Sequence, residues 1–428
     1  MDMGERSGDF RASMARHSFV RIAFIAAVAA VAVVLVFLSL TVGTRDLSMG
    51  EVFRLFIDHL SGVTYDRDIQ HDLWYDDNIV WNYRLPRALF AIIAGAGLAV
   101  AGAAMQSVMK NPLADPYTTG ISSGALLGVA VAMVLGFSAG MGGIDGYGTI
   151  INAMIFAMIP VIVIYVMSPF LNKSPATLIL AGTAVSYLFN SLTDILLVST
   201  DEETLSTVYK WQVGNLSDLS WDAIPFVLVS CVVGMAVLMV LSNKLNLMSL
   251  DDKDAKALGL DSEKMRIVCL IVLSFMAASI ISFAGIIGFV GLIVPHMVRL
   301  VVGSDNRFVI PGAIAVGGAF LLGCDIVSRA IDVSAVIPVG VITSLIGAPI
   351  FLALIIRQRR SVWRRPPTGS GGASPDTGRR PAAGCSTRRP YCWCSSSSAS
   401  TRCRSAGSTS PSARPWESSG TTSQATSP

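Results

Sequence analysis

Uninterrupted apolar stretches about 20 residues long recur along most of this 428-residue chain. A helix rises about 1.5 Å per residue, so about 20 apolar residues cross a bilayer core about 30 Å thick. Only 14% of the residues are charged, whereas about 25% is usual in soluble domains. Because backbone polar groups in lipid must be bonded within the segment itself, we predict an all-α, polytopic integral membrane protein.

Ten stretches are predicted to be transmembrane helices. Residues 22–42 follow four arginines and lack the cleavage site of a signal peptide, which favours an uncleaved anchor. Residues 288–302 are short for a span and contain a proline, a histidine and an arginine, which favours a half-helix or a broken segment that is shielded by protein or lines a cavity. The other predicted spans are 88–109, 118–137, 149–171, 177–199, 223–242, 267–287, 309–331 and 338–356.

The charged residues outside the spans alternate in sign. Lys and Arg gather before the first span, in the 243–266 loop and after the last span, whereas Asp and Glu gather in the loops at 66–77 and 201–203. Basic loops are retained in the cytoplasm. The pattern predicts a multi-pass protein of the cytoplasmic (inner) cell membrane with both termini in the cytoplasm. The net charge of +3 is small and scattered, so nucleic acid is not an expected partner.

The chain is predicted to have three parts: a cytoplasmic segment 1–21, a transmembrane permease domain 22–357 and a tail 358–428. From Ser361 onward the tail contains no Leu, Ile, Met, Phe or Lys, so we expect it to be low in complexity and disordered. This composition is typical of a high-GC gene read in the wrong frame. A frameshift near codons 358–365 is therefore one hypothesis, and a functional disordered tail is the other.

The sequence carries no motif of a known catalytic or metal site. Walker A, HExxH, GxSxG and metal-spaced CxxC patterns are absent, and the four tail cysteines fit no zinc spacing, so we predict no metal site. Ionisable residues within spans are the usual functional candidates in a membrane protein; here they are Asp194, His296, Arg299, Asp325 and Arg329. A secondary transporter driven by an ion gradient stays open as an alternative, with Asp194 and Asp325 as its carboxylates, and a membrane-embedded enzyme is a more distant one.

Two loops have patterns that point to partners. Arg84-Leu-Pro-Arg87 leads into the second span, and its proline is placed to start a helix. In the 243–266 loop, the apolar residues fall on one face of a short helix, which suits docking into a groove of another protein; a solvated connector is the alternative. These apolar residues are Leu250, Ala255, Leu258 and Leu260.

Six motifs in unbroken order resemble one known family, the permease subunits of ABC importers for iron-siderophores, haem and cobalamin. They are Arg84–Arg87, Gly102–Gln106, Asn111–Pro116, Gly120–Gly124, Gly288–His296 with Arg299, and Pro338–Gly340 through Gly347–Pro349. The positions that carry the resemblance are Gln106, Asn111, Pro112, Asp115, Pro116, Gly120, Gly124, Gly291, Pro295, His296, Arg299, Pro338, Gly340, Gly347 and Pro349.

The resemblance implies a type II ABC importer permease fold of about ten helices that pairs with a second copy or a paralogue. It implies two cytoplasmic ATPase subunits, which use ATP and Mg, and an extracytoplasmic substrate-binding protein. The permease itself would be non-catalytic and bind no cofactor. The cargo we expect from it is a ferric siderophore, with haem or cobalamin as the alternative.

Site residues follow from the same resemblance. The segment from Leu250 to Arg266 would couple to the ATPases through Asp251, Asp254, Ala255, Leu258, Gly259 and Leu260. Arg84, Arg87 and Arg329 would dock the binding protein, although Arg84 and Arg87 could equally be interfacial anchors. The family usually has a glutamate where this chain has Val336, so any role of that carboxylate is absent here.

Overall fold

A computed structural model describes residues 3–137, 147–167, 175–217, 219–331 and 337–363, and every regular element in these ranges is helical. The contacts reported below all lie within one compact unit that ends at Pro366. The predicted tail from residue 364 onward and Val336 lie outside the described residues.

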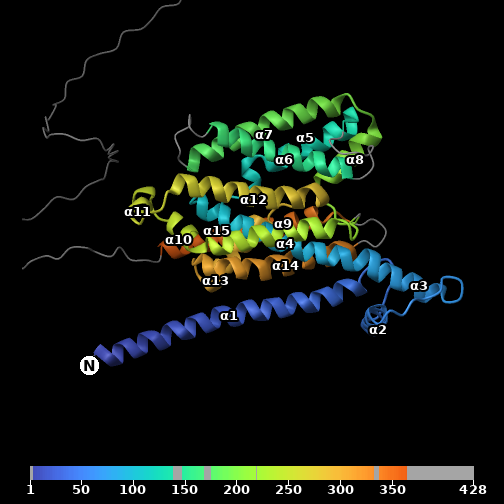
Figure 1. Cartoon of the computed structure of the whole chain (residues 1–428), viewed down its shortest axis with the longest axis horizontal. Helices are drawn as coiled ribbons and strands as arrows, with labels where there is room; N and C mark the ends of the chain where they lie inside the picture. Colours follow the sequence, from blue (N-terminus) through green and yellow to red (C-terminus); the bar gives the residue numbers. More distant parts are fainter. Residues whose placement is uncertain (1–2, 138–146, 168–174, 218, 332–336, 364–428) are drawn as a thin grey trace, which may run out of the picture. The chain divides into compact units, whose positions relative to one another are not determined.

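The predicted set of ten apolar helices is confirmed. In the described ranges, eight helical runs are long and apolar enough to cross a membrane, and two shorter apolar helices accompany them. The helices are α1 (Met3–Thr41), α4 (Leu85–Val108), α5 (Ile121–Leu135), α6 (Tyr147–Met167), α7 (Pro175–Val198), α9 (Ala223–Val240), α12 (Ser262–Ala284), α13 (Val290–Val302), α14 (Asn306–Ile331) and α15 (Val339–Trp363) (Figure 1).

Helix α4 is the central helix of the bundle and packs against α9, α12, α13 and α14. Glycines allow this close packing, because a Cβ on Gly95 would overlap the carbonyl oxygen of Gly317 on α14. A Cβ on Gly102 would in the same way overlap the carbonyl oxygen of Gly291 on α13. Helices in lipid associate through such close backbone approach rather than through the hydrophobic effect.

A second group of helices, α5, α6 and α7, packs on the other side of α12 (Figure 1). Gly124 and Gly128 lie one turn apart on α5, and a Cβ on either would overlap backbone oxygens of α6. Small residues therefore set the spacing in both groups.

The segment 43–83, for which no element was predicted, contains three helical pieces: α2 (Met49–Leu60), α3 (His71–Asn78) and the π-helix η1 (Ile79–Arg84). Helix α2 begins with a capping box between Ser48 and Glu51, a signal that the sequence does carry.

Pro86 lies in the first turn of α4, where the sequence places it, but the helical run does not begin there. Helices α3, η1 and α4 form one run without a break, from His71 to Val108. Pro86 follows directly after the π turn, in which the N–H of Leu85 donates to the carbonyl of Val80. A proline lacks the N–H and crowds the preceding turn, and the wider π turn accommodates it without ending the helix.

The expected break before 288–302 is confirmed, and α13 is a helix of only 13 residues. Gly285 and Phe289 both have positive φ, of 71° and 69°. The freed carbonyls find donors: Asn215 N bonds Ala284 O at 2.8 Å, and the Tyr117 hydroxyl bonds Ile287 O at 3.1 Å. Non-helical backbone at this depth is therefore shielded by protein, as membrane insertion requires.

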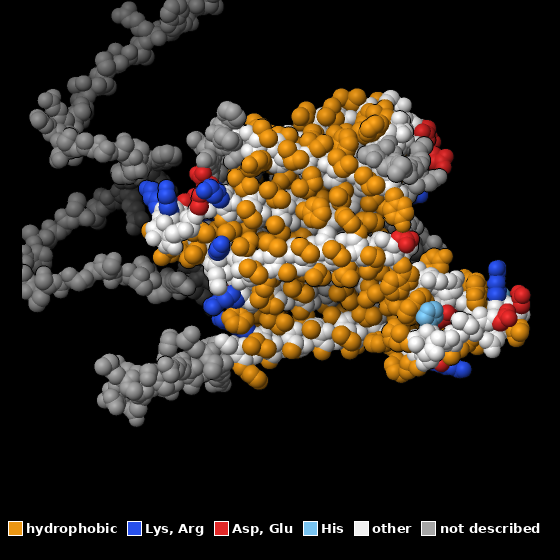
Figure 2. All heavy atoms as spheres, in the orientation of Figure 1, with side chains coloured by type: hydrophobic (Ala, Val, Ile, Leu, Met, Phe, Trp, Pro, Cys, Tyr) orange, Lys and Arg blue, Asp and Glu red, His pale blue; other side chains and the backbone are white. Residues whose placement is uncertain are grey.

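Short helices cap the two ends of the bundle. Helices α10 (Ser242–Met248) and α11 (Asp252–Ala257) lie at one end of α4, and α2 and α3 lie at the other (Figure 1). The 3₁₀ turn η2 (Pro116–Thr119) and α8 (Glu202–Gln212) complete the elements. In the view of Figure 2, apolar side chains cover the face between the two ends, and charged side chains gather at the ends themselves.

Candidate functional site

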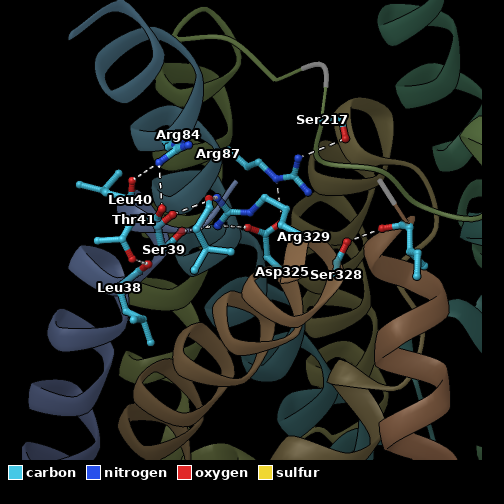
Figure 3. A network of polar contacts seen from close by, with 12 residues as sticks. Leu38, Ser39, Leu40, Thr41, Arg84, Arg87, Ser217, Asp325, Ser328 and Arg329 are labelled. Carbon is cyan, nitrogen blue, oxygen red and sulfur yellow. Dashed lines mark hydrogen bonds and ion pairs between the residues drawn. The ribbon is translucent and has the colours of Figure 1, made fainter. Parts of the chain in front are cut away.

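Three arginines and one aspartate meet at the end of the bundle that carries α2 and α3 (Figure 3). Arg84 comes from η1, Arg87 from α4, and Asp325 and Arg329 from α14. All four are buried, with exposed fractions of 5%, 7%, 0% and 6%. The structure thus brings together the three arginines that the sequence predicted to act as one group.

Asp325 lies between two guanidinium groups. Arg87 Nε is 2.7 Å from its Oδ1 and Arg329 Nη2 is 2.9 Å from its Oδ2. Arg87 also donates to the hydroxyl of Ser217 at 3.1 Å. Buried charges are tolerated only when they are paired. Asp325 pairs with Arg87 and Arg329 but not with Arg84, so the four residues together carry a positive charge.

Arg84 and Arg329 both bind the carboxyl end of α1. The last carbonyls of a helix lack intrahelical partners, and cations are favourable there. Arg84 donates to Leu40 O at 2.6 Å, Thr41 O at 3.1 Å and Arg45 O at 2.5 Å, and Arg329 to Ser39 O at 2.9 Å and Val42 O at 2.8 Å. The two arginines therefore join α1 to α4 and α14.

The same arginines line a cavity of about 370 Å³, together with Tyr75, Tyr83 and Ser217. The guanidinium groups are thus both internally bonded and next to open space. Their docking role stays a prediction.

Three of the five aspartates in the acidic loop at 66–77 lie beside a basic side chain: Asp72, Asp76 and Asp77. Arg45 Nε lies 2.5 Å from Asp76 Oδ1, and the Arg45 guanidinium also lies 3.6 Å from Asp72. The imidazole of His59 lies 3.1 Å from both oxygens of Asp77. Local pairing of this kind reduces the field that the loop imposes on the arginines.

At the opposite end, Arg299 joins α13 to α4. Its guanidinium donates to Gln106 Oε1 at 2.7 Å and to the carbonyl of Ala103 at 3.1 Å. Gln106 in turn donates to Leu292 O at 3.1 Å. Gln106 and Arg299 therefore bond to each other, and their hydrogen bonds fix how α13 lies against α4.

This polar network continues into α10 through residues that the sequence did not reveal. Ser107 Oγ lies 3.3 Å from Asn306 Oδ1, and Asn306 N donates to Asn246 Oδ1 at 2.8 Å. Asn246 Nδ2 donates to Asp305 Oδ1 at 2.8 Å. The hydrogen bonds of Asp305 with Arg307 lower its pKa to about 2. The only sequence signal was the Asp-Asn pair that precedes α14, a common helix start.

The predicted coupling segment contains helix α11, but its apolar face is only partly as expected. Ala255 and Leu260 are buried, whereas Leu250 and Leu258 are exposed, because the left-handed Gly259 (φ 85°) ends the helix and turns the chain. The three charged or glycine positions of the predicted set, Asp251, Asp254 and Gly259, are exposed. A pocket of about 440 Å³ lies beside them, along residues 252–263.

A second contact ties α11 to the bundle. Asp252 lies 2.7 Å from Lys110 Nζ at the end of α4 and 3.5 Å from Arg266 on α12. The hydrogen bond from Lys110 is the main cause that holds the pKa of Asp252 below its usual value. Helices α10 and α11 are therefore each attached to transmembrane helices by polar side chains.

The turn after α4 holds several further motif positions. Asp115 caps η2 through a 3.0 Å hydrogen bond from Tyr117 N, and burial raises the pKa of its carboxyl to about 6. Asn111 bonds Leu113 N at 2.9 Å, Pro116 is buried and Pro112 is exposed.

Other motif positions serve helix packing. Gly120 adopts a left-handed φ of 90°, and a Cβ on Gly340 or Gly347 would overlap Val213 O or Phe289. The remaining positions are Pro295 within α13, the half-buried His296, the half-buried Pro338 and the exposed Pro349.

The two carboxylates considered for an ion-gradient-driven transporter lie in different surroundings. Asp194 is exposed on α7, and Asp325 is bound between Arg87 and Arg329. Among the described residues, no group of three or more His, Cys, Asp or Glu side chains is placed to hold a metal ion.

Several curated proteins are similar to this chain. A cobalamin import system permease, BtuC of Halobacterium salinarum, is 40% identical over 278 residues, which are 65% of this chain and 73% of that protein. The hemin transport permease HmuU of Yersinia pestis is 35% identical over 285 residues, 65% of this chain and 84% of that protein. The iron(3+)-hydroxamate import permease FhuB of Bacillus subtilis is 31% identical over 328 residues, 76% of this chain and 81% of that protein.

A solved structure agrees with these relatives. A metal-chelate type ABC transporter in an inward-facing conformation matches with a TM-score of 0.67 and 31% identity, over 78% of this chain and 98% of that chain. The family model of the FecCD transport family matches residues 31–357. With its apolar helices and motifs in this arrangement, the chain belongs to the FecCD transport family and is a multi-pass permease of an ABC importer.

Proposed function

We propose that this chain is the non-catalytic translocation subunit of an ATP-driven importer that carries a ferric siderophore across the cytoplasmic membrane. The relative named as an iron(3+)-hydroxamate permease supports this cargo. The relatives named for cobalamin and hemin make those two the alternatives.

One observation carries the proposal beyond family membership: the arginine-lined cavity and the exposed α11 segment lie at opposite ends of α4 (Figure 1). The α10–α11 end contains the Lys and Arg residues of the 243–266 loop. Since basic loops stay in the cytoplasm, that end would face the cytoplasm with both chain termini. The arginine cavity would then face outward.

An outward-facing cavity lined by arginines suits an acidic partner. Guanidinium groups form strong, directional pairs with carboxylates, and Asp325 neutralises only one of the three positive charges. We infer that Arg84, Arg87 and Arg329 receive acidic side chains of a substrate-binding protein. Transport would then run inward only, because the binding protein delivers its cargo only to that side.

The inner end would receive the force that moves the helices. Two cytoplasmic ATPase subunits, which use ATP and Mg, would bind the exposed residues of 250–260. Their closure would pull on α14 through the contact of Asn246 with Asp305, and on α4 and α12 through Asp252. A second copy or a paralogous permease would complete the translocation path.

An ion-gradient-driven transporter is supported less well. Such a protein needs a carboxylate that gains and loses a proton along the path. Asp325 is fixed between Arg87 and Arg329, and Asp194 is exposed on the outside of the bundle.

The test is uptake in the native host after deletion of the gene. Cells are complemented with the full chain or with residues 1–360, and uptake of iron-55 as ferric hydroxamate, iron-55 haemin and cobalt-57 cobalamin is measured under iron starvation. Arsenate depletes ATP in one set, and a protonophore collapses the gradient in another. We expect ferric hydroxamate uptake to be lost on deletion, restored by both forms and abolished by arsenate.

A variant at the inner end is compared with a control on α1. Asp254→Lys should abolish uptake while the variant protein still accumulates in the membrane, whereas Val34→Leu on the exposed face of α1 should leave uptake unchanged. Restored uptake of cobalamin or haemin alone would refute the siderophore cargo. Uptake that follows the proton gradient after ATP depletion would refute the importer mechanism itself.

A further inference from the structure

Helix α2 presents an apolar strip that the protein leaves uncovered. Met49, Phe53, Ile57 and Leu60 have exposed fractions of 46%, 53%, 45% and 65%. Their spacing of four, four and three residues places them on one face of the helix. Four large apolar side chains in one row are more than the scattered exposure usual on a protein surface.

The other two faces of α2 are accounted for. Val52 and Leu55 are buried in a small hydrophobic cluster that includes Val80 of η1 and Leu85 of α4. The third face is polar, and there Arg54 lies 3.5 Å from Asp58. The helix therefore has one face on the protein, one suited to water and one without a partner in the described residues.

We propose that α2 lies flat in the interfacial layer of the bilayer, with the strip of Met49, Phe53, Ile57 and Leu60 against lipid acyl chains. Three observations support lipid as the occupant: continuity with a lipid-facing helix, the direction of α2, and the aromatic residues beside it.

The strip continues the exposed apolar surface of α1, a helix long and apolar enough to cross a membrane. Helix α1 packs mainly on α14 and exposes Val33, Val34 and Leu38. Phe37 of α1 contacts Phe53, with ring centroids 6.4 Å apart. The exposed face of α2 therefore joins that of α1 without an intervening polar boundary, and Figure 2 shows apolar side chains at this end beside α1.

The direction of α2 suits an interfacial helix. In Figure 1, α1 runs across the picture whereas α2 is seen nearly end-on, so α2 lies crosswise to α1. With 12 residues, α2 is about 18 Å long and too short to cross the bilayer. A short helix with one polar and one apolar face, lying across the end of a spanning helix, is typical of the membrane interface.

Aromatic side chains also gather beside α2. Trp81 packs on Phe56 of α2, with ring centroids 6.1 Å apart. Trp81 also lies 5.8 Å from Trp221, whose indole N–H donates to the Trp81 carbonyl at 3.0 Å. Tryptophans gather at membrane–water boundaries because the ring is amphipathic, so this group places the boundary at α2.

In this position, α2 would hold the arginine cluster at a fixed depth relative to the bilayer. The cluster of apolar residues under α2 includes Leu85, the residue next to Arg84. The lipid contact of Phe53 and Ile57 would therefore act on the position of Arg84 through packed side chains.

The test uses the full chain, with its seven cysteines replaced by serine or alanine, reconstituted in phosphatidylcholine/phosphatidylglycerol vesicles. Nitroxide labels at Phe53→Cys and Ile57→Cys are compared with matched labels at Glu51→Cys and Arg54→Cys, by EPR power saturation with oxygen and with a nickel chelate. We expect oxygen to relax the first pair severalfold more than nickel does, and nickel to relax the second pair more.

Equal accessibility to both reagents at 53 and 57 would overturn the proposal in favour of exposure to water. Low accessibility to both would overturn it in favour of a protein occupant, such as a second copy. Because the cysteine-free protein could fold poorly, the unmodified chain is also photolysed with a diazirine-bearing phospholipid. Failure to label the peptide 49–60 while peptides of α1 are labelled would equally refute it. None of these readouts depends on cargo or on the ATPases.

Discussion

Helices α1 and α4 are both predicted spans, yet they occupy opposite positions in the protein. In the apolar window of α1 only 6% of the residues are buried, whereas in that of α4 the share is 83%. The more apolar of the two is α1, with its Val, Leu and Phe, while α4 is rich in Ala and Gly. In this pair, the more apolar helix is the exposed one, and the helix rich in small residues is the one packed inside the protein.

The two helices are also held differently. Helix α4 touches its neighbours along its length through glycines. Helix α1 packs mainly along α14. Arg84 and Arg329 donate five hydrogen bonds to backbone oxygens at its carboxyl end, three within the helix and two beyond it, at Val42 and Arg45. Changes to the centre should therefore affect the whole protein, and changes to the periphery should stay local.

The largest effect is expected from Gly102→Leu in α4. The new side chain would overlap the backbone of Gly291, and neither helix can move without disturbing its other contacts, so overpacking should exceed the usual ~1–3 kcal/mol. We expect loss of folded protein by size-exclusion chromatography in detergent. A normal elution profile would contradict the close contact of α4 with α13.

Asp325→Ala should have the next largest effect. The change leaves Arg87 and Arg329 buried without their shared carboxylate, and breaking a buried pair in this way costs about 3–5 kcal/mol. We expect a clear drop in the thermal unfolding midpoint in detergent. Asp254→Ala, at an exposed carboxylate, is the control and should leave the midpoint unchanged.

Arg84→Met should affect α1 and α4 differently. Its main-chain acceptors lie at the end of α1 and at Arg45, and hydrogen bonds from a charged group contribute about 1.5–3 kcal/mol. We expect faster hydrogen exchange in residues 36–48 with little change in α4. Equal acceleration in both helices would show that Arg84 stabilises the centre as well.

Asp115→Asn should change the pH dependence of stability at the end of α4. Burial raises the pKa of Asp115 to about 6, from about 3.9 in the unfolded chain. Between these values the folded protein holds more protons than the unfolded chain, so stability falls as pH rises from 4 to 6. The variant should lack this fall and be more stable at pH 7 by up to about 3 kcal/mol.

Wild type and variant are compared by thermal unfolding at pH 4 and pH 7. Identical pH profiles would show that the Asp115 carboxyl is solvated. The control Asp254→Asn, at an exposed position, should keep the profile of the wild type.

The smallest effect is expected from Val34→Ala on the exposed face of α1. Its side chain is 64% exposed and faces lipid in our assignment, so stability should change by less than about 0.5 kcal/mol. A large loss in thermal midpoint would show that a partner protein covers this face and would weaken the contrast between the two helices.

Much of this fold follows from the sequence. The sequence alone locates the ten apolar stretches, the short segment 288–302 and the motifs near Gln106 and Arg299. Hydropathy over 20 residues is a local property, and the bilayer turns it into a helix because lipid offers no other partner for the backbone.

The sequence missed features that depend on contacts between distant residues. It predicted the proline at the start of α4, but not the π turn that joins α4 to the helix before it. It did not reveal which residue binds Asp325, because the partner Arg87 lies 238 residues away in the sequence. Asn246, an ordinary loop residue in the sequence, bonds the start of α14.

The sequence by itself therefore determined that the chain spans a membrane, where its helices lie and which family it belongs to. Only the tertiary structure decided which helix faces lipid, which carboxylate pairs with which arginine and how α10 and α11 attach to the bundle. The physical reason is range: burial of apolar segments in lipid is set by neighbours in sequence, whereas ion pairs and glycine contacts form only when segments far apart in the chain approach within a few ångströms.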